Sequence, residues 1–285
     1  MKSIIFIGHV AVDIIKEPES KLIPGGGVYY GADAVKAVSD DVNVKIFTKM
    51  APEHVHLFDD LTTRGIDLEI IETPSSTTFE NVYPDSNPDH RISYCHEKAA
   101  AWSVDDLSKL KSDAIIISAL WTPEFPEEII PEVRHHTDFL VVDVQGYTRY
   151  IRADNSIEHH DWKNKKDYFK YFDLIKLDAK EATMLTGKTD MFEALDELVQ
   201  LCSESAFLVC THKNGIVLKG KNRIYESSFG EYSIKGRTGR GDTVTAVLTT
   251  FLINGMDEQK ALDKTAEITT IKMQHIGSLR REYIG

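Results

Sequence analysis

The sequence predicts an α/β fold of three layers, with a mainly parallel central sheet, helices on both faces and a small β-hairpin lid. From residue 114 onward, apolar runs of strand length alternate with helical patterns, which is typical of a parallel sheet covered by helices. Between residues 66 and 97 the pattern changes to β-forming residues around a polar turn at 84–89, which predicts an inserted hairpin. We expect residues 1–285 to form a single domain, with a lid insert at approximately 70–97 and a contribution from 13–24.

The remaining elements follow from apolar periodicity and from turn residues. A charged stretch with two adjacent histidines, residues 152–170, is expected to be a surface excursion. Short antiparallel strands are expected at 216–218, 223–226 and 231–234. The main strands are predicted at residues 4–7, 42–48, 114–118, 139–144, 174–177 and 206–211, and the main helices at 30–38, 57–64, 126–135, 192–202, 244–253 and 261–273.

Two glycine clusters each precede a predicted helix. Gly25, Gly26 and Gly27 permit close approach of the backbone to a ligand, whereas the alternative is a flexible linker. Residues 236–242 form the second cluster, which ends at Asp242. The unpaired N–H groups of a helix start and the helix dipole favour an anion there, commonly a phosphate.

Acidic residues beside these turns have two interpretations each. Asp242 is either a helix cap or a base beside a bound phosphate, and spacing alone favours the cap. Asp13, which follows the first strand, is either a ligand for substrate hydroxyls or a solvent-exposed loop residue. Asp178 and Glu181, three apart at a strand-to-helix junction, could hold hydrated Mg²⁺, but alone they are better explained as capping residues. The hairpin is likewise either a lid or an edge extension without function.

The composition excludes several classes of protein. With 33 Lys and Arg against 45 Asp and Glu, the formal net charge of −12 disfavours a nucleic-acid-binding protein. The three scattered cysteines form no CxxC pair, so neither a zinc site nor a disulfide framework is indicated, and the expected compartment is the reducing cytoplasm. No apolar run reaches 18 residues, so no membrane span is expected.

Two further motifs are discounted. The stretch from Gly215 to Lys221 has P-loop spacing, but Asn222 replaces the required Ser or Thr and no long helix follows, so a hairpin turn is the better interpretation. The paired histidines have no metal-ligand spacing and lie in polar sequence. An oxidoreductase would need G-x-G-x-x-G after the first strand, where this chain offers only Gly8.

The clusters and their order together resemble a known family. The triple glycine before a helix, the hairpin insert, Asp178-Ala179-Lys180-Glu181 and Thr238-Gly239-Arg240-Gly241-Asp242 occur in the order seen in ribokinase-like (PfkB) carbohydrate and nucleoside kinases. The resemblance covers nearly the whole chain, and the last stretch is its most specific part. Residues 77–83 and 143–147 are similar to an archaeal branch that includes inositol and nucleoside kinases.

The chain departs from the family pattern at four positions. The usual Asp-x-Thr-Gly-Ala-Gly-Asp has Gly236 in place of its first Asp and Arg240 in place of Ala. The usual Asn-x-x-Glu begins with Asp178, and the Asn of the N-terminal glycine motif is replaced by Tyr30. These departures affect the expected metal and substrate contacts, whereas Gly239, Gly241 and Asp242 keep the pattern.

The resemblance implies an ATP- and Mg²⁺-dependent kinase that phosphorylates a hydroxyl of a small sugar, a polyol such as inositol, or a nucleoside. Asp242 would be the general base, and the N–H groups of the preceding turn would hold the transferring phosphoryl. The Arg240 side chain would either contact phosphate or point outward. The remaining roles implied are catalysis for Gly239, Arg240 and Gly241, substrate binding for Asp13, Gly26, Gly27 and Tyr30, nucleotide binding for Thr211, Gly215, Thr238 and the C-terminal helix, and metal binding for Glu181 and Asp178.

Two further expectations concern function and assembly. A non-catalytic ligand-sensing protein with the kinase fold is the alternative function, and the intact Gly239, Gly241 and Asp242 argue against it. The exposed edges of the hairpin could pair two subunits into a homodimer.

Overall fold

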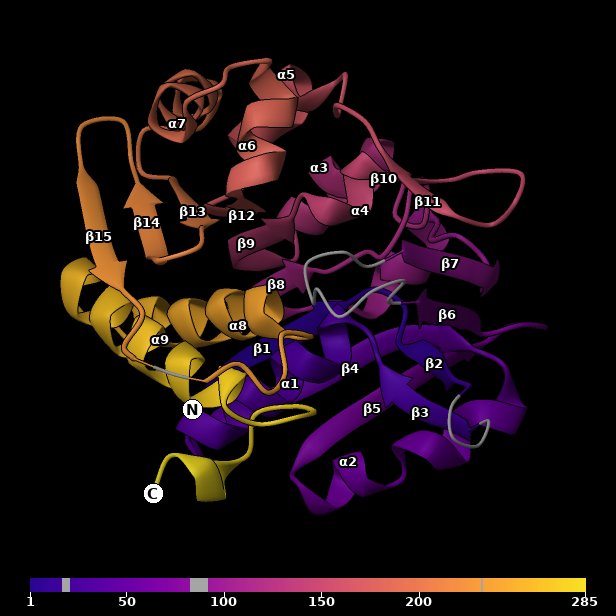
Figure 1. Cartoon of the computed structure of the whole chain (residues 1–285). Coiled ribbons are helices and arrows are strands. Elements are labelled where there is room, and N and C mark those ends of the chain that lie inside the picture. Colours follow the sequence, from indigo (N-terminus) through magenta and orange to yellow (C-terminus); the bar gives the residue numbers. More distant parts are fainter. Residues whose placement is uncertain (17–20, 83–91, 232) are drawn as a thin grey trace.

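A computed structural model describes residues 1–16, 21–82, 92–231 and 233–285 (Figure 1). The predicted hairpin turn at 84–89 lies outside the described residues. The largest element is a nine-stranded sheet in the order β15-β14-β13-β12-β9-β8-β1-β4-β5. Its strands from β5 to β13 pair in parallel, and β14 and β15 add antiparallel strands at one edge. The strands are β1 (Lys2–Ile7), β4 (Val42–Met50), β5 (Ile66–Glu72), β8 (Ser112–Ile117), β9 (Thr137–Asp143), β12 (Leu174–Asp178), β13 (Phe207–Thr211), β14 (Gly215–Lys219) and β15 (Ile224–Ser228).

Helices cover both faces of this sheet, which confirms the predicted fold class (Figure 1). One core lies under α1, α2, α8 and α9, and a second core lies under α3, α6 and α7. Successive residues of one strand alternate between the two cores: Ile4 and Phe6 of β1 belong to the first, and Ile5 and Ile7 belong to the second. The helices are α1 (Gly27–Val38), α2 (Asp60–Thr63), α3 (Ile130–Arg134), α4 (Gln145–Thr148), α5 (Lys165–Tyr168), α6 (Ala179–Thr186), α7 (Met191–Leu198), α8 (Arg240–Ile253) and α9 (Glu258–Met273), and short 3₁₀ turns lie at Pro52–Phe58, Val104–Lys109, Glu127–Ile129, Phe169–Tyr171, Val199–Leu201 and Arg281–Tyr283.

A second, four-stranded sheet lies beside the large one (Figure 1). Its order is β3-β2-β6-β7, and its strands are β2 (Ala11–Ile15), β3 (Lys21–Gly25), β6 (Thr77–Val82) and β7 (Ile92–Glu97). The sequence predicted a hairpin at 70–97 with a contribution from 13–24. The sheet instead begins its second half at Thr77, because residues 70–72 belong to β5 of the large sheet. The parallel pairing of β2 with β6 joins segments about 65 residues apart, which a local pattern does not reveal.

A further hairpin, β10 (Arg149–Ile151) with β11 (Ile157–His159), lies next to β7 (Figure 1). The residues Tyr94 and Ser156 form an isolated β-bridge, and the Cys95 N–H donates to the Asn155 carbonyl oxygen over 2.9 Å. Residues 152–170, predicted as a surface excursion, are mostly exposed, and their first part belongs to this hairpin. The apolar content of this hairpin is too small for its pairing to stand out in the sequence.

The predicted strand at 231–234 is also wrong where it can be tested, since residues 231, 233 and 234 lie in bends and coil.

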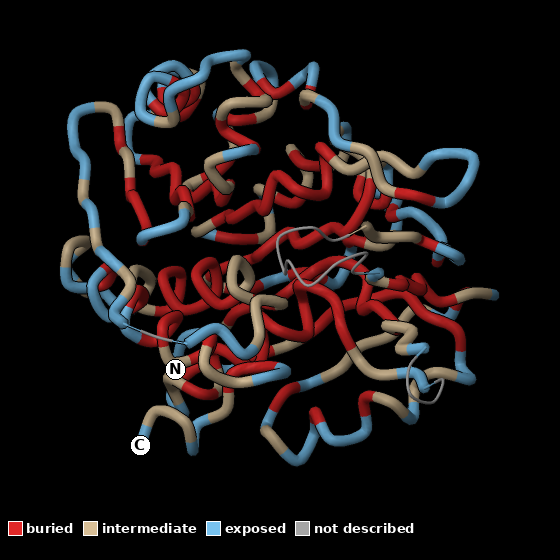
Figure 2. Tube along the Cα trace, in the orientation of Figure 1, coloured by how far each residue is buried: buried red, intermediate tan, exposed pale blue. Residues whose placement is uncertain are grey.

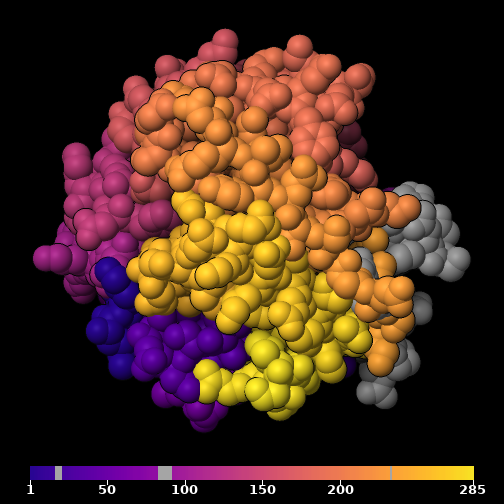
Figure 3. Space-filling view, turned by 90° about the vertical axis from the view of Figure 1, so that its left-hand side faces the viewer, coloured from indigo at the N-terminus to yellow at the C-terminus, as the bar shows by residue number. Residues whose placement is uncertain are grey.

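Figure 2 shows buried chain running through both sheets and through the helices that pack on them. Figure 3 shows the face where the C-terminal segment lies against the N-terminal half of the chain. There, Arg281 donates to the Lys36 carbonyl oxygen over 3.1 Å. In the described part of the chain, no helix is both long and apolar enough to cross a membrane.

Candidate active site

One cavity of about 930 Å³ lies where the carboxyl ends of the parallel strands meet the four-stranded sheet. In open α/β sheets this edge is the usual ligand site. The strands β9 and β13 contribute their last residues, Asp143 and Thr211, and β12 contributes Lys176 from its middle. The N-termini of α1 and α8 contribute Gly27 and Asp242. Of the residues predicted for the site, Asp13, Gly26, Gly27, Tyr30, Asp178, Glu181, Thr211, Thr238, Arg240, Gly241 and Asp242 line this cavity, whereas Gly215 and Gly239 do not.

Asp242 lies in the first turn of α8 and does not cap that helix. The N-cap is Gly239, which has φ of +84° and no side-chain capping bond. A Cβ on Gly27 would lie 2.6 Å from Asp242 Oδ1, so the carboxylate lies against the start of α1. Burial raises the pKa of the Asp242 carboxyl, the Asp143 carboxylate raises it further, and Lys176 opposes both. The cap interpretation, which spacing alone favoured, is therefore wrong.

At two other positions of the site, a neighbouring side chain leaves room only for glycine. A Cβ on Gly239 would lie 2.7 Å from Cδ1 of Tyr30, and a Cβ on Gly241 would lie 2.8 Å from Nζ of Lys176. Contacts this close exclude any larger residue unless the neighbour moves. The ring of Tyr30 therefore lies directly against the turn that precedes α8, and the ammonium of Lys176 lies against the first turn of that helix.

The amide groups of this turn differ in their partners. The Arg240 N–H donates to the Arg237 carbonyl oxygen over 3.1 Å, and the Thr243 N–H donates to the Gly239 carbonyl oxygen over 2.9 Å. The sequence predicted that the N–H groups of Gly239, Arg240 and Gly241 hold a phosphoryl. Because the Arg240 N–H closes the turn, a contribution of Arg240 to anion binding would come from its guanidinium, and Arg240 is among the residues that line the cavity.

Lys176 and Asp143 were not predicted as site residues. Both are buried, and Lys176 Nζ lies 3.0 Å from Asp143 Oδ2 and 4.0 Å from Glu181 Oε2. Burial lowers the pKa of Lys176, but the surrounding carboxylates, led by Asp143, outweigh it and raise the pKa overall. A lysine in the middle of an apolar strand was the available signal, because a buried ammonium requires charged partners.

Asp178 and Glu181 form a reciprocal capping box at the start of α6. Asp178 Oδ1 accepts from the Glu181 N–H over 2.8 Å, and Glu181 Oε2 accepts from the Asp178 N–H over 2.7 Å. Each carboxylate thus commits one oxygen to the helix start, and both residues line the cavity. Burial raises the pKa of Glu181, opposed by Lys176. In the described ranges, no group of three or more His, Cys, Asp and Glu side chains forms a metal cage.

The four-stranded sheet supplies polar groups on the other side of the cavity. Asp13 lies on β2, and its carboxylate lies directly against Gly25, where a side chain would overlap it. Asn81 of β6 and Ser93 of β7 face each other, with Ser93 Oγ donating to Asn81 Oδ1 over 2.7 Å. All three side chains line the cavity. Hydrogen-bonding groups on this side suit a ligand with several hydroxyls.

Basic side chains gather in the cavity beyond those predicted. Besides Arg240, the lining includes Arg149 and Arg152 of the β10–β11 hairpin, together with Lys180 and Arg237. The Arg149 charge lowers the pKa of both Asp242 and Glu181, so Arg149 lies near the centre of the site. Arg149 and Arg152 come from a segment with no recognisable motif, whereas Lys180 and Arg237 lie within the predicted motifs, and only the tertiary structure brings the four together.

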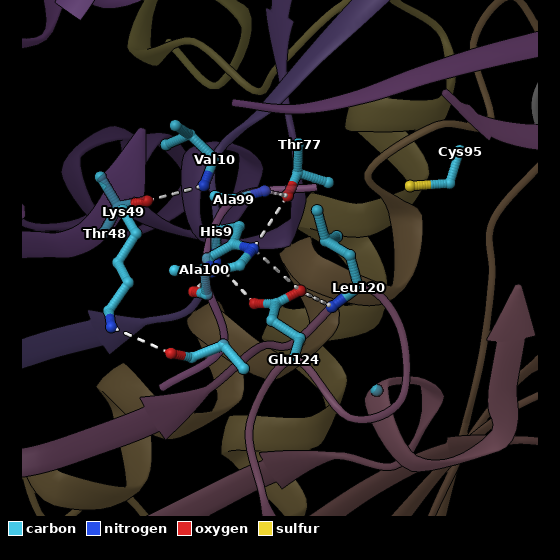
Figure 4. Close-up of polar contacts among 12 residues, drawn as sticks. His9, Val10, Thr48, Lys49, Thr77, Cys95, Ala99, Ala100, Leu120 and Glu124 are labelled. Carbon is cyan, nitrogen blue, oxygen red and sulfur yellow. Dashed lines mark hydrogen bonds and ion pairs between the residues drawn. The ribbon is translucent and has the colours of Figure 1, made fainter. Parts of the chain in front are cut away.

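A buried polar cluster connects the two sheets just behind the cavity (Figure 4). Glu124 Oε1 accepts from the His9 N–H and Oε2 accepts from the Leu120 N–H, each over 2.7 Å. His9 Nε2 lies 3.1 Å from the Ala100 carbonyl oxygen, which can only accept, so Nε2 carries the proton. His9 Nδ1 then accepts from the Thr77 hydroxyl over 2.9 Å. The cluster therefore fixes the start of β6 and the loops after β1 and β8.

Comparison with solved structures gives close matches over the full chain. A sulfate complex of a pyrophosphate-dependent kinase in the ribokinase family is 35% identical, with a TM-score of 0.90 and 99% of each chain covered. A pyrophosphate-dependent kinase of that family, complexed with a pyrophosphate analog and myo-inositol, is 34% identical with a TM-score of 0.88, covering 99% of this chain and 98% of that one. The chain belongs to the ribokinase family. This kinase is therefore a phosphotransferase that acts on a hydroxyl group of a small sugar or polyol.

More distant matches to the kinase agree in fold. Ribokinase from Thermotoga maritima is 14% identical with a TM-score of 0.73, covering 100% of this chain and 98% of that one. The bifunctional protein HldE of Hydrogenovibrio crunogenus is 24% identical over 213 residues, which are 70% of this chain. The match spans only 38% of the length of HldE. No protein-family model matches the chain.

Proposed function

We propose that this kinase transfers a phosphoryl group from pyrophosphate to one hydroxyl of a small cyclic polyol of the inositol type. The observation that carries the proposal is the position of Asp242, a half-buried carboxylate that lines the same cavity as the basic side chains and the hydroxyl-binding residues of the four-stranded sheet. A base is needed at that boundary, because the attacking hydroxyl meets the transferring phosphorus there.

The donor is inferred from the basic side chains and from the extent of the cavity. Lys176, Arg237 and Arg240 surround the turn before α8, and Arg149 adds a fourth charge. Pyrophosphate is small and carries several negative charges, so dense cationic contacts can supply the binding energy that a nucleoside would otherwise provide. Among the described residues, none from β14 or α9 lines the cavity, although the sequence predicted Gly215 and the C-terminal helix for the nucleotide. Thr211 and Thr238, which were predicted for the same role, do line it. Two solved relatives are themselves pyrophosphate-dependent kinases.

The acceptor is inferred from the four-stranded sheet. Asp13, Asn81 and Ser93 present hydrogen-bonding groups that match the hydroxyls of a polyol ring. The related kinase complexed with myo-inositol supports this class of acceptor. In another relative, 33% identical, substitution of an asparagine and a serine by leucine converts a myo-inositol-1 kinase into a myo-inositol-3 kinase. Asn81 and Ser93 are the residues of this chain that we assign to the choice of hydroxyl.

The proposed reaction is an in-line displacement at phosphorus. Asp242 accepts the proton of the acceptor hydroxyl, whose oxygen forms a bond to the phosphorus as the bond to the leaving phosphate breaks. The Gly241 N–H and the dipole of α8 stabilise the charge on the transferring group. Lys176, Arg237 and Arg240 stabilise the charge on the leaving phosphate. The four-stranded sheet covers the acceptor and limits access of water.

Magnesium fits the carboxylates at the start of α6. Asp178 and Glu181 each keep one oxygen outside the capping box, and Mg²⁺ commonly binds one or two carboxylates together with substrate phosphates and water. The bound ion would neutralise donor phosphate charge. Glu181 and Asp178 would hold it through its water ligands, while their capping bonds keep both side chains oriented.

A panel of donors and acceptors tests the proposal. Purified protein is incubated with pyrophosphate, ATP or GTP and with cyclic polyols, sugars or nucleosides, and the phosphorylated product is measured by phosphorus NMR. We expect turnover with pyrophosphate and a cyclic polyol. Asp242→Asn should keep pyrophosphate binding in calorimetry and lose about 10²–10⁴-fold in turnover. Turnover with ATP alone would establish the donor that the sequence predicted and reject pyrophosphate.

Arg240 offers a sharper test of the donor, because the family pattern has alanine at its position. The Arg240→Ala variant should lose about 10- to 100-fold in kcat/KM for pyrophosphate, since a charge-assisted hydrogen bond is removed. Arg223→Ala, which removes an exposed arginine paired with Glu258, is the control and should leave the rate unchanged. An unchanged rate in Arg240→Ala would remove this side chain from the donor site.

A further inference from the structure

Lys272 is a fully buried lysine whose ammonium lies behind the turn that carries Asp242. It lies in the last turn of α9, and its side chain is 1% exposed. Lys272 Nζ donates to the Gly236 carbonyl oxygen over 3.1 Å. Gly236 is the residue at which the glycine-rich turn begins. Burial strongly destabilises an ammonium that lacks compensating partners.

The segment at Gly236 is docked on the C-terminal end of α9. The N–H groups of Lys235 and Gly236 both donate to the Met273 carbonyl oxygen, over 2.9 and 3.2 Å. A Cβ on Gly236 would lie 2.5 Å from the His275 carbonyl oxygen. Lys272 completes the contact by a bond in the opposite direction, from the helix to the segment. The turn therefore starts from a fixed point on α9.

The Lys272 ammonium lies beside the Gly236 carbonyl oxygen, and Lys272 belongs to the last turn of α9. The described structure records no carboxylate ion pair for Lys272, unlike Lys176, which contacts Asp143 directly. The negative end of the α9 dipole stabilises a cation at this position. Asp242 also interacts electrostatically with Lys272 and partly offsets the effect of burial, which lowers the pKa of Lys272 to about 8. The surroundings of Lys272 therefore resemble a cation-binding site in which the cation is the lysine ammonium itself.

We propose that the Lys272 ammonium is a built-in cation that fixes the anion-binding turn for phosphoryl transfer, so that this kinase needs no monovalent metal ion at that place. Lys272 is a positioning residue: it acts through Gly236 and the following residues and does not touch the reacting atoms. Its charge offsets the carbonyl groups behind the turn, so that the N–H groups of the turn stay directed at the phosphoryl group. The inference rests on the proposed phosphoryl transfer at Asp242.

Three variants separate charge, hydrogen bond and general effects on α9. Lys272→Met removes both charge and bond at similar length, and Lys272→Gln keeps a donor for the Gly236 carbonyl oxygen but removes the charge. Lys264→Met removes an exposed lysine of the same helix and is the control. Each variant is assayed for kcat and for KM of the acceptor, with circular dichroism and the melting temperature as measures of folding.

We expect Lys272→Met and Lys272→Gln to lose about 10²-fold in kcat, because small displacements of catalytic groups have effects of that size. The KM of the acceptor should stay within about twofold, since its contacts on the four-stranded sheet are untouched. Ammonium or methylammonium chloride should restore part of the rate of Lys272→Met, and the control should match the wild type. Full activity of a folded Lys272→Gln would show that no charge is needed and would overturn the inference.

If Lys272→Met and Lys272→Gln both fail to fold, the wild-type protein tests the role of Lys272 instead. Its rate should change less than about twofold when potassium chloride replaces choline chloride at constant ionic strength, because the cation site is filled by Lys272. A strong activation by potassium would overturn the inference. Absence of turnover with every donor and acceptor would reject the proposed function and this inference with it, whereas an active wild type with unaffected variants rejects this inference alone.

Discussion

At the scale of single residues, the site depends on small residues beside large functional ones. Gly27 leaves room for the Asp242 carboxylate, Gly239 for the Tyr30 ring and Gly241 for the Lys176 ammonium. The sequence indicated glycines that allow a ligand to approach the backbone. The structure shows a second reason, because each of these glycines contacts a side chain of the site itself.

Gly27→Ala tests this complementarity. The new Cβ would overlap Ser118 Oγ and lie 2.6 Å from Asp242 Oδ1, so both groups must move away from their present positions. We expect kcat to fall by about 10²-fold with the fold retained, because the displaced carboxylate no longer meets the acceptor hydroxyl. Gly230→Ala is the control, since its Cβ would have an ordinary contact with Thr270 at 3.5 Å. Equal kcat values for Gly27→Ala and Gly230→Ala in steady-state kinetics would contradict this expectation.

His9 predicts how stability depends on pH. Burial is the main cause that lowers the pKa of His9 from 6.5 to about 3 in the folded protein. Between these values the unfolded chain takes up a proton that the folded chain does not, so the free energy of unfolding falls as the pH falls below 6.5. The contribution of His9 to the slope should reach about 1.4 kcal/mol per pH unit, and it fades within about one pH unit above 6.5.

Urea unfolding between pH 7.5 and 4.5 measures this slope. His9→Gln, which cannot take up the proton in either state, should have a shallower pH dependence by one proton. The exposed His135→Gln is the matched control and should keep the slope of the wild type. Equal slopes for His9→Gln and the wild type would show that His9 does not stay neutral in the folded protein.

At the scale of elements, the start of α6 combines a structural and a functional role. The sequence offered capping or metal binding as alternatives for Asp178 and Glu181. The structure shows the capping box, and the same carboxylates line the cavity. The two roles are compatible because a carboxylate has two oxygens, and a cap uses only one of them.

Glu181→Gln separates the two roles. Glutamine keeps an oxygen that can accept from the Asp178 N–H, so the melting temperature should change little. The charge that attracts the metal is lost, so the Mg²⁺ concentration for half-maximal activity should rise severalfold. The titration is repeated for Glu193→Gln, an exposed residue of α7, as a control. An unchanged Mg²⁺ titration for Glu181→Gln would remove this residue from the metal site.

At the scale of the whole molecule, the cavity is assembled from three separate units. The large sheet and α8, which packs on it, provide Lys176, Asp242 and Arg240, the four-stranded sheet provides the hydroxyl-binding groups, and the β10–β11 hairpin provides Arg149 and Arg152. The buried cluster around His9 and Glu124 connects the first two units (Figure 4). A donor that contacts several units should therefore stabilise the whole chain.

Thermal unfolding measures this stabilisation. At 100 times its dissociation constant, a ligand of the folded state adds about 2.7 kcal/mol, which corresponds to a rise of several degrees in the melting temperature for a protein of this size. We expect this rise with pyrophosphate and Mg²⁺, and a smaller one with adenosine, which lacks phosphate. Arg240→Ala should reduce the rise with pyrophosphate. A larger rise with adenosine than with pyrophosphate would argue for a nucleoside-binding site.

The sequence by itself determined the alternation of strands and helices, the two glycine turns and the family, because these depend on local periodicity and on motifs that are continuous in the chain. Eleven of the thirteen site residues that it predicted line the cavity. Only the tertiary structure decided that Asp242 does not cap α8, that Lys176, Arg149 and Arg237 join the cavity, and that Lys272 lies behind the turn. The physical reason is that a charge acts through its neighbours in space, and these neighbours come from strands and helices far apart in the chain.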